Sequence, residues 1–145
     1  MNILFINGPS LNMLGIREKE IYGTRSYAEL CAFIETVCAA EGAECEIFQS
    51  NHEGAIIDRI QAAYGKADAI VINPAAYTHT SVAILDALRA VSLPTVEVHL
   101  SRIEEREDFR RFSYTALACE RVISGKGFDG YGEAIRYLVE RFKKY

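Results

Sequence analysis

Short apolar runs that are typical of buried strands alternate along this chain with amphipathic stretches that are typical of helices. The runs are rich in Ile, Val and Leu and end at glycine, proline or polar residues, which is expected of strands covered on both faces. We expect strands at Asn2–Asn7, Glu44–Gln49, Ala69–Asn73, Thr95–His99 and around Val122–Ile123. Alternation of this kind predicts a parallel sheet with helices on both faces.

The stretches between the strands each place apolar residues on one face. Ser26 is expected to cap a helix that buries Leu30, Phe33, Ile34, Val37 and Cys38 and that ends before Gly42. Further helices are expected at Glu53–Tyr64, Thr80–Val91, Glu104–Phe112 and Tyr131–Lys144. The predicted fold is therefore an α/β three-layer sandwich, and the flavodoxin-like strand order 2-1-3-4-5 is the expected arrangement for five strands.

Composition limits the classes to which the chain can belong. Its 145 residues, half of them hydrophobic, fit one domain over residues 1–145, and a net charge of -4 offers no basic surface for nucleic acid. We expect a soluble, cytoplasmic protein, because neither a secretory leader nor an apolar run long enough to span a membrane is present. The four cysteines (Cys31, Cys38, Cys45 and Cys119) lack C-x-x-C spacing and are expected to be reduced thiols.

Folds of this class bind ligands at the carboxyl ends of their strands. Three of the predicted strands end in polar residues: Asn7, Asn73 and His99. The first connection, Gly8–Arg25, has about 18 residues, against a median of about 4–6 for such loops. We expect this long connection to be a lid or a binding loop rather than a surface excursion.

The long connection contains Asn12, Arg17 and Tyr22. A loop tyrosine is ordinarily a packed ring with a solvated hydroxyl, and a phenol with a pKa of about 10 is roughly 0.1% ionised at neutral pH. Bringing that pKa to about 7 takes roughly 4 kcal/mol, which one or two neighbouring arginines and hydrogen bonds supply. Tyr22 is thus a candidate base for a proton next to a ketone.

The fourth strand ends in a histidine with a carboxylate two residues earlier on the same face, Glu97 and His99. His99 is either a satisfied boundary residue or a proton donor that Glu97 orients and holds charged. Backbone N–H groups of Leu100 and Ser101, just past the strand, are candidates to receive a carboxylate.

Other polar residues follow the third and fourth strands. Asn73 and His79 can hydrogen-bond a polyol, while Thr80 or Ser81 is needed to cap the next helix. Arg106 and Arg110, spaced i,i+4 in the expected charged helix, either project together toward the site or belong to a solvated face.

Neither a metal site nor a nucleotide site is indicated. The three histidines (His52, His79 and His99) lie on different loops, each without a second ligand at i+2 to i+4, and phosphate-loop and dinucleotide motifs do not occur.

Taken together, these segments resemble the type II 3-dehydroquinate dehydratase family over nearly the whole chain. The resemblance is carried by Ile6–Pro9, Leu14-Gly15, Arg17-Glu18, Tyr22-Gly23, Asn73-Pro74, Thr78–Ser81, Asp86, Glu97–His99, Arg106-Glu107, Phe109-Arg110, Ser113-Tyr114 and Gly125–Tyr131. It implies a flavodoxin-like dehydratase that uses neither a cofactor nor a metal nor a Schiff-base lysine, assembled as a homododecamer of four trimers.

The resemblance also implies roles for individual residues. Tyr22 would act as base, with Arg17 and Arg106 lowering its pKa, and His99, oriented by Glu97, would protonate the leaving hydroxyl. A water near the first loop, where Ser10 and Asn12 lie, would stabilise the enolate. The implied substrate-binding residues are Asn73, His79, Arg110, Leu100, Ser101 and, in a neighbouring subunit's site, Asp86.

Four positions depart from the pattern of that family. Ser10 stands where asparagine is usual, Lys19 where proline is common and Arg102 where asparagine is common. Ala75 stands where glycine is common, and we expect it to be harmless only if its backbone needs neither a positive φ nor a close approach. The alternatives to an active dehydratase are an impaired relative that binds shikimate-type ligands as a sensor or subunit, and a flavin or signalling domain of the same fold.

Overall fold

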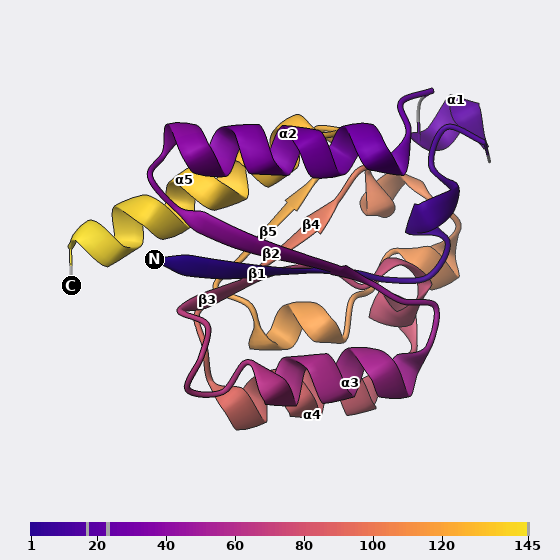
Figure 1. The fold of residues 1–145 in the computed structure, drawn as a ribbon. Coiled ribbons are helices and arrows are strands. Elements are labelled where there is room, and N and C mark those ends of the chain that lie inside the picture. The colour runs from indigo at the N-terminus through magenta and orange to yellow at the C-terminus, as the bar shows by residue number, and fades with distance from the viewer. Residues whose placement is uncertain (17, 23, 145) are drawn as a thin grey trace.

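A computed structural model describes residues 1–16, 18–22 and 24–144 of the chain; for Lys19 and Tyr22 it describes the backbone. Five parallel strands form the middle layer, in the order β2-β1-β3-β4-β5 (Figure 1). The strands are β1 (Asn2–Asn7), β2 (Glu44–Gln49), β3 (Ala69–Asn73), β4 (Thr95–His99) and β5 (Arg121–Ser124). The predicted strand order is confirmed, and the first four strands have the predicted bounds.

Helices cover both faces of the sheet (Figure 1). The helices α2 (Tyr27–Ala40) and α5 (Asp129–Lys143) lie on one face, and α3 (Glu53–Ala62) and α4 (Val82–Val91) on the other. Alternate side chains of a strand point to opposite faces. Ile3 and Phe5 accordingly join the core under α2 and α5, while Leu4 and Ile6 join the core under α3 and α4.

The helix ends follow local sequence signals. The Ser26 hydroxyl caps α2 by accepting the Glu29 N–H at 3.1 Å, and the Ser81 hydroxyl caps α4 by accepting the Ile84 N–H at 2.9 Å. The helices α3, α4 and α5 begin and end within two residues of the predicted bounds. None of the helices among the described residues is long and apolar enough to cross a membrane.

The predicted helix at Glu104–Phe112 is wrong. That segment forms two 3-10 turns, η3 (Ile103–Glu105) and η4 (Asp108–Arg110), because Arg106 and Glu107 have extended backbones with ψ of -175° and 151°. The chain just beyond this segment is held by tertiary hydrogen bonds, including one from the Tyr114 N–H to the Thr78 carbonyl at 2.8 Å. These bonds outweigh the local preference for a helix that the spacing of the charged residues predicted.

Short elements absent from the sequence-based prediction surround the carboxyl edge of the sheet. They are η1 (Leu11–Met13) and α1 (Lys19–Tyr22) in the long first connection, η2 (Ala75–His79) after β3, and η5 (Thr115–Ala118) before β5. The strand register gathers polar residues at the same edge: Asn7 lies beside both Gln49 and Asn73, and His99 lies beside Ser124.

The glycine that follows β1 allows the first connection to pass close to β3. The Gly8 N–H donates to the Asn73 carbonyl at 2.8 Å, and a Cβ at Gly8 would lie 2.5 Å from the Pro74 carbonyl oxygen. Backbone atoms cannot rotate away from such a contact as a side chain can. A residue with a side chain at this position must therefore push the two segments apart.

We predict that Gly8→Ala destabilises the protein by about 1–3 kcal/mol, the usual cost of overpacking. Gly54→Ala is the matched control, because Gly54 lies in α3 and a Cβ there meets no atom within 4 Å. The control should be neutral or stabilising by up to about 1 kcal/mol, since alanine favours helix. Thermal unfolding of both variants measures this, and an unchanged midpoint for Gly8→Ala would contradict the close-approach argument.

Candidate active site

A cavity of about 370 Å³ lies at the carboxyl edge of the sheet. It brings together eight of the residues predicted from the sequence: Ser10, Asn73, His79, His99, Leu100, Ser101, Arg106 and Arg110. Its remaining lining residues are Pro9, Leu11, Glu18, Ala75, Ala76 and Ile103. Polar and cationic side chains from three separate segments thus converge on one small space.

His99 and Glu97 form a buried pair at the end of β4. The His99 Nε2 lies 2.7 Å from Glu97 Oε2, with His99 5% exposed and Glu97 fully buried. Burial raises the pKa of the Glu97 carboxyl, but the bond from His99 and its charge, with hydroxyl donors from Thr115 and Ser113, outweigh burial and leave it below its usual value. An ionised Glu97 therefore accepts a hydrogen bond from His99 and orients its ring.

The ring of His79 is held in place by the backbone carbonyl of Phe112. Its Nδ1 lies 2.8 Å from the Phe112 oxygen, and because a carbonyl only accepts, Nδ1 carries the proton. Burial lowers the pKa of His79, opposed by that hydrogen bond and by Glu97 and reinforced by the charges of His99 and Arg110. The neutral ring thus has Nε2 free to accept a hydrogen bond from a hydroxyl.

Two buried asparagines at adjacent strand ends have different roles. Asn73 lines the cavity, and its Oδ1 accepts the Ala75 N–H at 3.1 Å. Asn7 does not line the cavity: its Oδ1 accepts from the Tyr131 hydroxyl at 2.6 Å, and its Nδ2 donates to the Tyr27 hydroxyl at 3.3 Å. Asn7 therefore joins β1 to α2 and α5, while Asn73 is placed to meet a ligand.

The two predicted arginines reach the cavity, although not through the i,i+4 helix spacing proposed for them. Arg106 Nη1 donates to the Ser101 hydroxyl at 3.3 Å. Arg110 Nε lies 3.0 Å from Glu107 Oε2, but its N–H does not point at that oxygen, and its guanidinium lies over the Phe109 ring. Both cations provide positive potential for an anionic ligand.

The start of the long connection is held by residues at the end of β2. The Ser10 N–H donates to Asn51 Oδ1 at 2.9 Å, and Gln49 Nε2 donates to the Gly8 carbonyl at 3.1 Å. Asn12 is exposed and accepts from Gln49 Nε2 at 3.4 Å without lining the cavity. Ser10 is therefore part of the cavity wall, and Asn12 lies outside it.

Two residues that depart from the family pattern have left-handed backbones at the cavity. Ser10 has a φ of 68° and Ala75 a φ of 53°. The condition under which Ala75 is harmless is therefore not met, since a left-handed conformation costs a residue with a Cβ roughly 1–2 kcal/mol. Arg102 lies outside the cavity lining and packs against Gly125.

Besides Glu97 and Asn12, three further predicted residues are not placed in this cavity. Arg17 lies outside the described residues, and so does the side chain of Tyr22, whose backbone ends α1. Asp86 is exposed on α4 and does not line the cavity of its own chain.

Three hydroxyl residues that surround Glu97 received no role in the sequence analysis: Thr78, Ser113 and Thr115. Serine and threonine in loops carry no distinctive pattern. The available signal was the carboxylate itself, because a glutamate inside a predicted buried strand needs donors.

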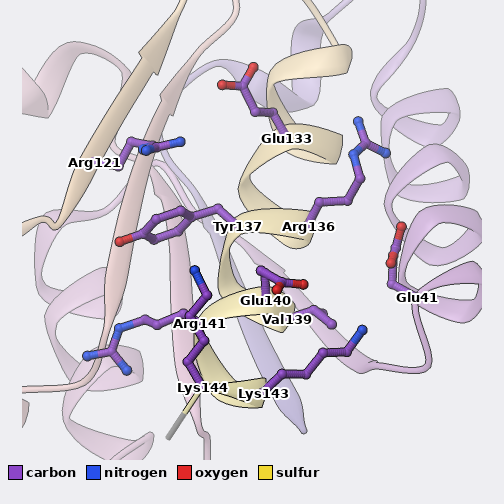
Figure 2. A pocket seen from close by; sticks show the side chains of 10 residues that line it. All are labelled: Glu41, Arg121, Glu133, Arg136, Tyr137, Val139, Glu140, Arg141, Lys143 and Lys144. Atoms are coloured by element: carbon purple, nitrogen blue, oxygen red, sulfur yellow. The ribbon is translucent and has the colours of Figure 1, made fainter.

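A larger cavity, of about 590 Å³, lies along α5, away from the strand ends (Figure 2). Two of its cations already have partners: Arg141 pairs with Glu120 at 2.8 Å, and Arg121 lies over the Tyr137 ring at 4.4 Å. Figure 2 shows side chains that splay outward from α5 rather than converge on one point. The chemistry is therefore assigned to the smaller cavity.

The arrangement defines a class of protein: a flavodoxin-like α/β domain with an acid–base site for a small, hydroxylated anion at the carboxyl edge of its sheet. Across the described residues, His, Cys, Asp and Glu side chains nowhere gather in a group of three or more that could hold a metal ion. The donors and acceptors of the cavity suit proton transfer by side chains.

Comparison with known proteins gives the family. The family described as "Dehydroquinase class II" matches residues 1–139. The chain is 55% identical to the 3-dehydroquinate dehydratase of Clostridium acetobutylicum, covering 99% of this chain and all of the relative. It is 52% identical to the catabolic 3-dehydroquinase of Verticillium alfalfae, covering 97% and 94%.

Comparison with a solved structure leads to the same family. The type II dehydroquinase of Butyrivibrio crossotus superposes with a TM-score of 0.94 at 54% identity, over 95% of this chain and 97% of that one. The chain belongs to the class II dehydroquinase family.

We predict that Ser10→Asn raises stability by up to about 1 kcal/mol, because asparagine adopts a left-handed backbone at lower cost than serine. Ser92→Asn is a matched control, since Ser92 is an exposed left-handed cap of α4 that does not line the cavity, with a φ of 55°. Both variants should unfold at a higher temperature than the wild type. A lower midpoint for Ser10→Asn alone would mean that the serine side chain makes a contact that asparagine cannot replace.

Proposed function

We propose that this chain is a lyase that dehydrates 3-dehydroquinate to 3-dehydroshikimate by elimination through an enolate. The observation that carries the proposal is the buried His99–Glu97 pair at 2.7 Å, facing a cavity lined by arginines and polyol-binding side chains. Near-full-length identity to proteins named 3-dehydroquinate dehydratase and catabolic 3-dehydroquinase supports the substrate. The reaction serves aromatic amino-acid biosynthesis or quinate catabolism, and some of the matching relatives are named as catabolic enzymes.

The first step removes the proton next to the ketone. Tyr22, as phenolate, takes that proton, and Arg17 and Arg106 stabilise the negative phenolate oxygen. The electrons of the broken C–H bond pass to the carbonyl oxygen and form the enolate. A water held near Ser10 and Asn12 stabilises the enolate oxygen, with the wall formed by Ser10 in support.

The second step expels the hydroxyl group. The enolate oxygen re-forms the carbonyl, and the electrons of the enolate double bond move to form the new carbon–carbon double bond. The bond from carbon to the leaving oxygen breaks as that oxygen takes a proton from His99. Because Nε2 of His99 is engaged by Glu97, Nδ1 is the nitrogen assigned to donate. Glu97 stabilises the imidazolium until the proton leaves, so that water and the conjugated enone are the products.

The remaining lining residues hold the substrate. Asn73, His79 and Arg110 bind its hydroxyl groups, with His79 Nε2 as an acceptor. The Leu100 and Ser101 amides and the Ser101 hydroxyl bind its carboxylate. The Arg106 guanidinium, in contact with the Ser101 hydroxyl at 3.3 Å, adds positive charge beside that carboxylate.

The proposed enzyme consists of one cytoplasmic domain, residues 1–145, and assembles as a homododecamer of four trimers. Asp86, exposed on α4 outside its own cavity, is assigned to the site of a neighbouring subunit. Its exposure supports that assignment, because a carboxylate in this position is available to a second chain. The proposed chemistry uses side chains, backbone amides and a water, with no cofactor and no metal.

The direct test is the rise in absorbance of the conjugated enone when purified protein meets 3-dehydroquinate near neutral pH. We expect turnover by the wild type, and a metal chelator should not reduce it. His52→Ala is the control and should keep the wild-type turnover, because the His52 ring is exposed and makes no capping bond to α3. His99→Ala should lose at least about 10²-fold, the lower range for a positioned general acid. A folded wild-type sample without turnover would overturn the proposal in favour of a ligand-binding relative.

The base assignment has its own test. Tyr22→Phe removes the phenolate oxygen and should lower kcat by about 10²–10⁴-fold. Tyr64→Phe is the control, because Tyr64 is 71% exposed and lies outside the cavity lining. If Tyr22→Phe keeps a near-normal kcat, another group is the base.

A further inference from the structure

Glu97 lies in a cage of three hydroxyl groups. Its Oε2 accepts from the Ser113 hydroxyl at 2.7 Å and from the Thr78 hydroxyl at 3.2 Å, in addition to His99. Its Oε1 accepts from the Thr115 hydroxyl. Thr78 and Thr115 are fully buried, as is the carboxylate. We define these three residues, Thr78, Ser113 and Thr115, as the hydroxyl cage.

The protons of the cage suit an ionised carboxylate. Each hydroxyl has one proton to donate, and an ionised carboxylate only accepts. The three oxygens also lie close to one another: Thr78 Oγ1 is 2.6 Å from Ser113 Oγ and 2.8 Å from Thr115 Oγ1. When Ser113 and Thr115 donate to Glu97, Thr78 can donate to the carboxylate or to either neighbour. A protonated Glu97 would instead need an acceptor among groups that are already donors to it.

The cage also determines where the cavity wall lies. Its members come from η2, from the residue before Tyr114 and from the first residue of η5. The Ala116 N–H donates to the Ser113 hydroxyl at 3.1 Å, and the Tyr114 N–H donates to the Thr78 carbonyl at 2.8 Å. The segment that carries Arg110 is thus tied to the same carboxylate that holds His99.

We propose that Thr78, Ser113 and Thr115 are positioning residues that keep Glu97 ionised and in place, so that His99 stays oriented and charged as the proton donor. This inference rests on the proposed function. The three residues act through Glu97 and do not line the cavity, so they are expected to affect the chemical step more than substrate binding.

Thr115→Val is the most selective variant, because valine keeps the shape of threonine and removes the donor to Oε1. Thr115→Ser restores a hydroxyl and is the rescue variant. Thr95→Val is the matched control: Thr95 is 1% exposed at the other end of β4, and its hydroxyl donates to the Leu93 carbonyl at 2.9 Å. The same atoms are therefore exchanged at a similar depth, beside Glu97 in one variant and at the far end of β4 in the other.

We expect Thr115→Val to lower kcat by about 10- to 100-fold, a part of the 10²–10⁴ that a positioned general acid supplies, with little change in KM. Thr115→Ser should recover most of that loss, and Thr95→Val should keep the wild-type kcat. An unchanged kcat for Thr115→Val in an enzyme whose wild type is active would overturn the inference and leave the proposed function intact.

A second readout needs no substrate. The depressed pKa of Glu97 means that the unfolded chain takes up a proton below about 4.5 while the folded chain does not, so this stabilisation is present above that pH and is lost as pH falls through the folded pKa. Removing the Thr115 donor raises the folded pKa, so Thr115→Val should begin to lose stability at a higher pH than the wild type. Thr95→Val should be destabilised by a similar amount at every pH.

The other titratable groups that face Glu97 are the same in all these variants. They are His99 on β4, His79 on η2 and the thiol of Cys119, whose pKa burial raises. If unfolding midpoints of Thr115→Val and Thr95→Val follow parallel curves with pH, the cage does not hold the charge of Glu97 and the inference is wrong. If only the Thr115→Val curve shifts but the wild type does not turn over 3-dehydroquinate, the proposed function fails and the charge-holding cage stands.

Discussion

A carboxylate buried at the end of a central strand is the interaction on which this site depends. An isolated charge in the interior costs many kcal/mol, so Glu97 is stable there only with donors on both of its oxygens. Those donors come from β4 itself, from η2 and from η5. Satisfying one charge therefore gathers three segments that are distant in sequence, and it fixes the ring of His99 at the same time.

The parallel sheet supplies the position for this charge. Strands β1, β3 and β4 end at one edge, and the polar residue at each end meets a different environment. Asn7 is enclosed by Tyr27 and Tyr131 and becomes structural, whereas Asn73 and His99 border a cavity. A polar residue at the carboxyl edge is a candidate for ligand binding. Whether a ligand can reach it depends on the helices and loops that pack over that strand end.

The sequence was sufficient for the sheet and its order because buried strands need continuous apolar runs, and the bounds of β1 to β4 agree with those runs. The helix expected at Glu104–Phe112 failed because side-chain spacing carries no information on tertiary bonds such as that between His79 and Phe112. The hydroxyl cage was missed for the same reason. Its members are recognised only once β4 and η5 lie side by side.

The two halves of the proposed chemistry are held in different ways. The acid and the anion-binding groups stand at the ends of paired strands, where register and burial fix their positions.

The proposed base ends the short helix α1 within the long first connection. That connection is anchored near β2 through Asn51 and Gln49, and near β3 through Gly8. Left-handed residues at Ser10 and Ala75 both line the cavity, where backbone strain is tolerated because neighbouring contacts maintain it. The sheet thus sets the positions of the proposed acid and anion-binding groups, whereas the proposed base belongs to a connection that is anchored at its start.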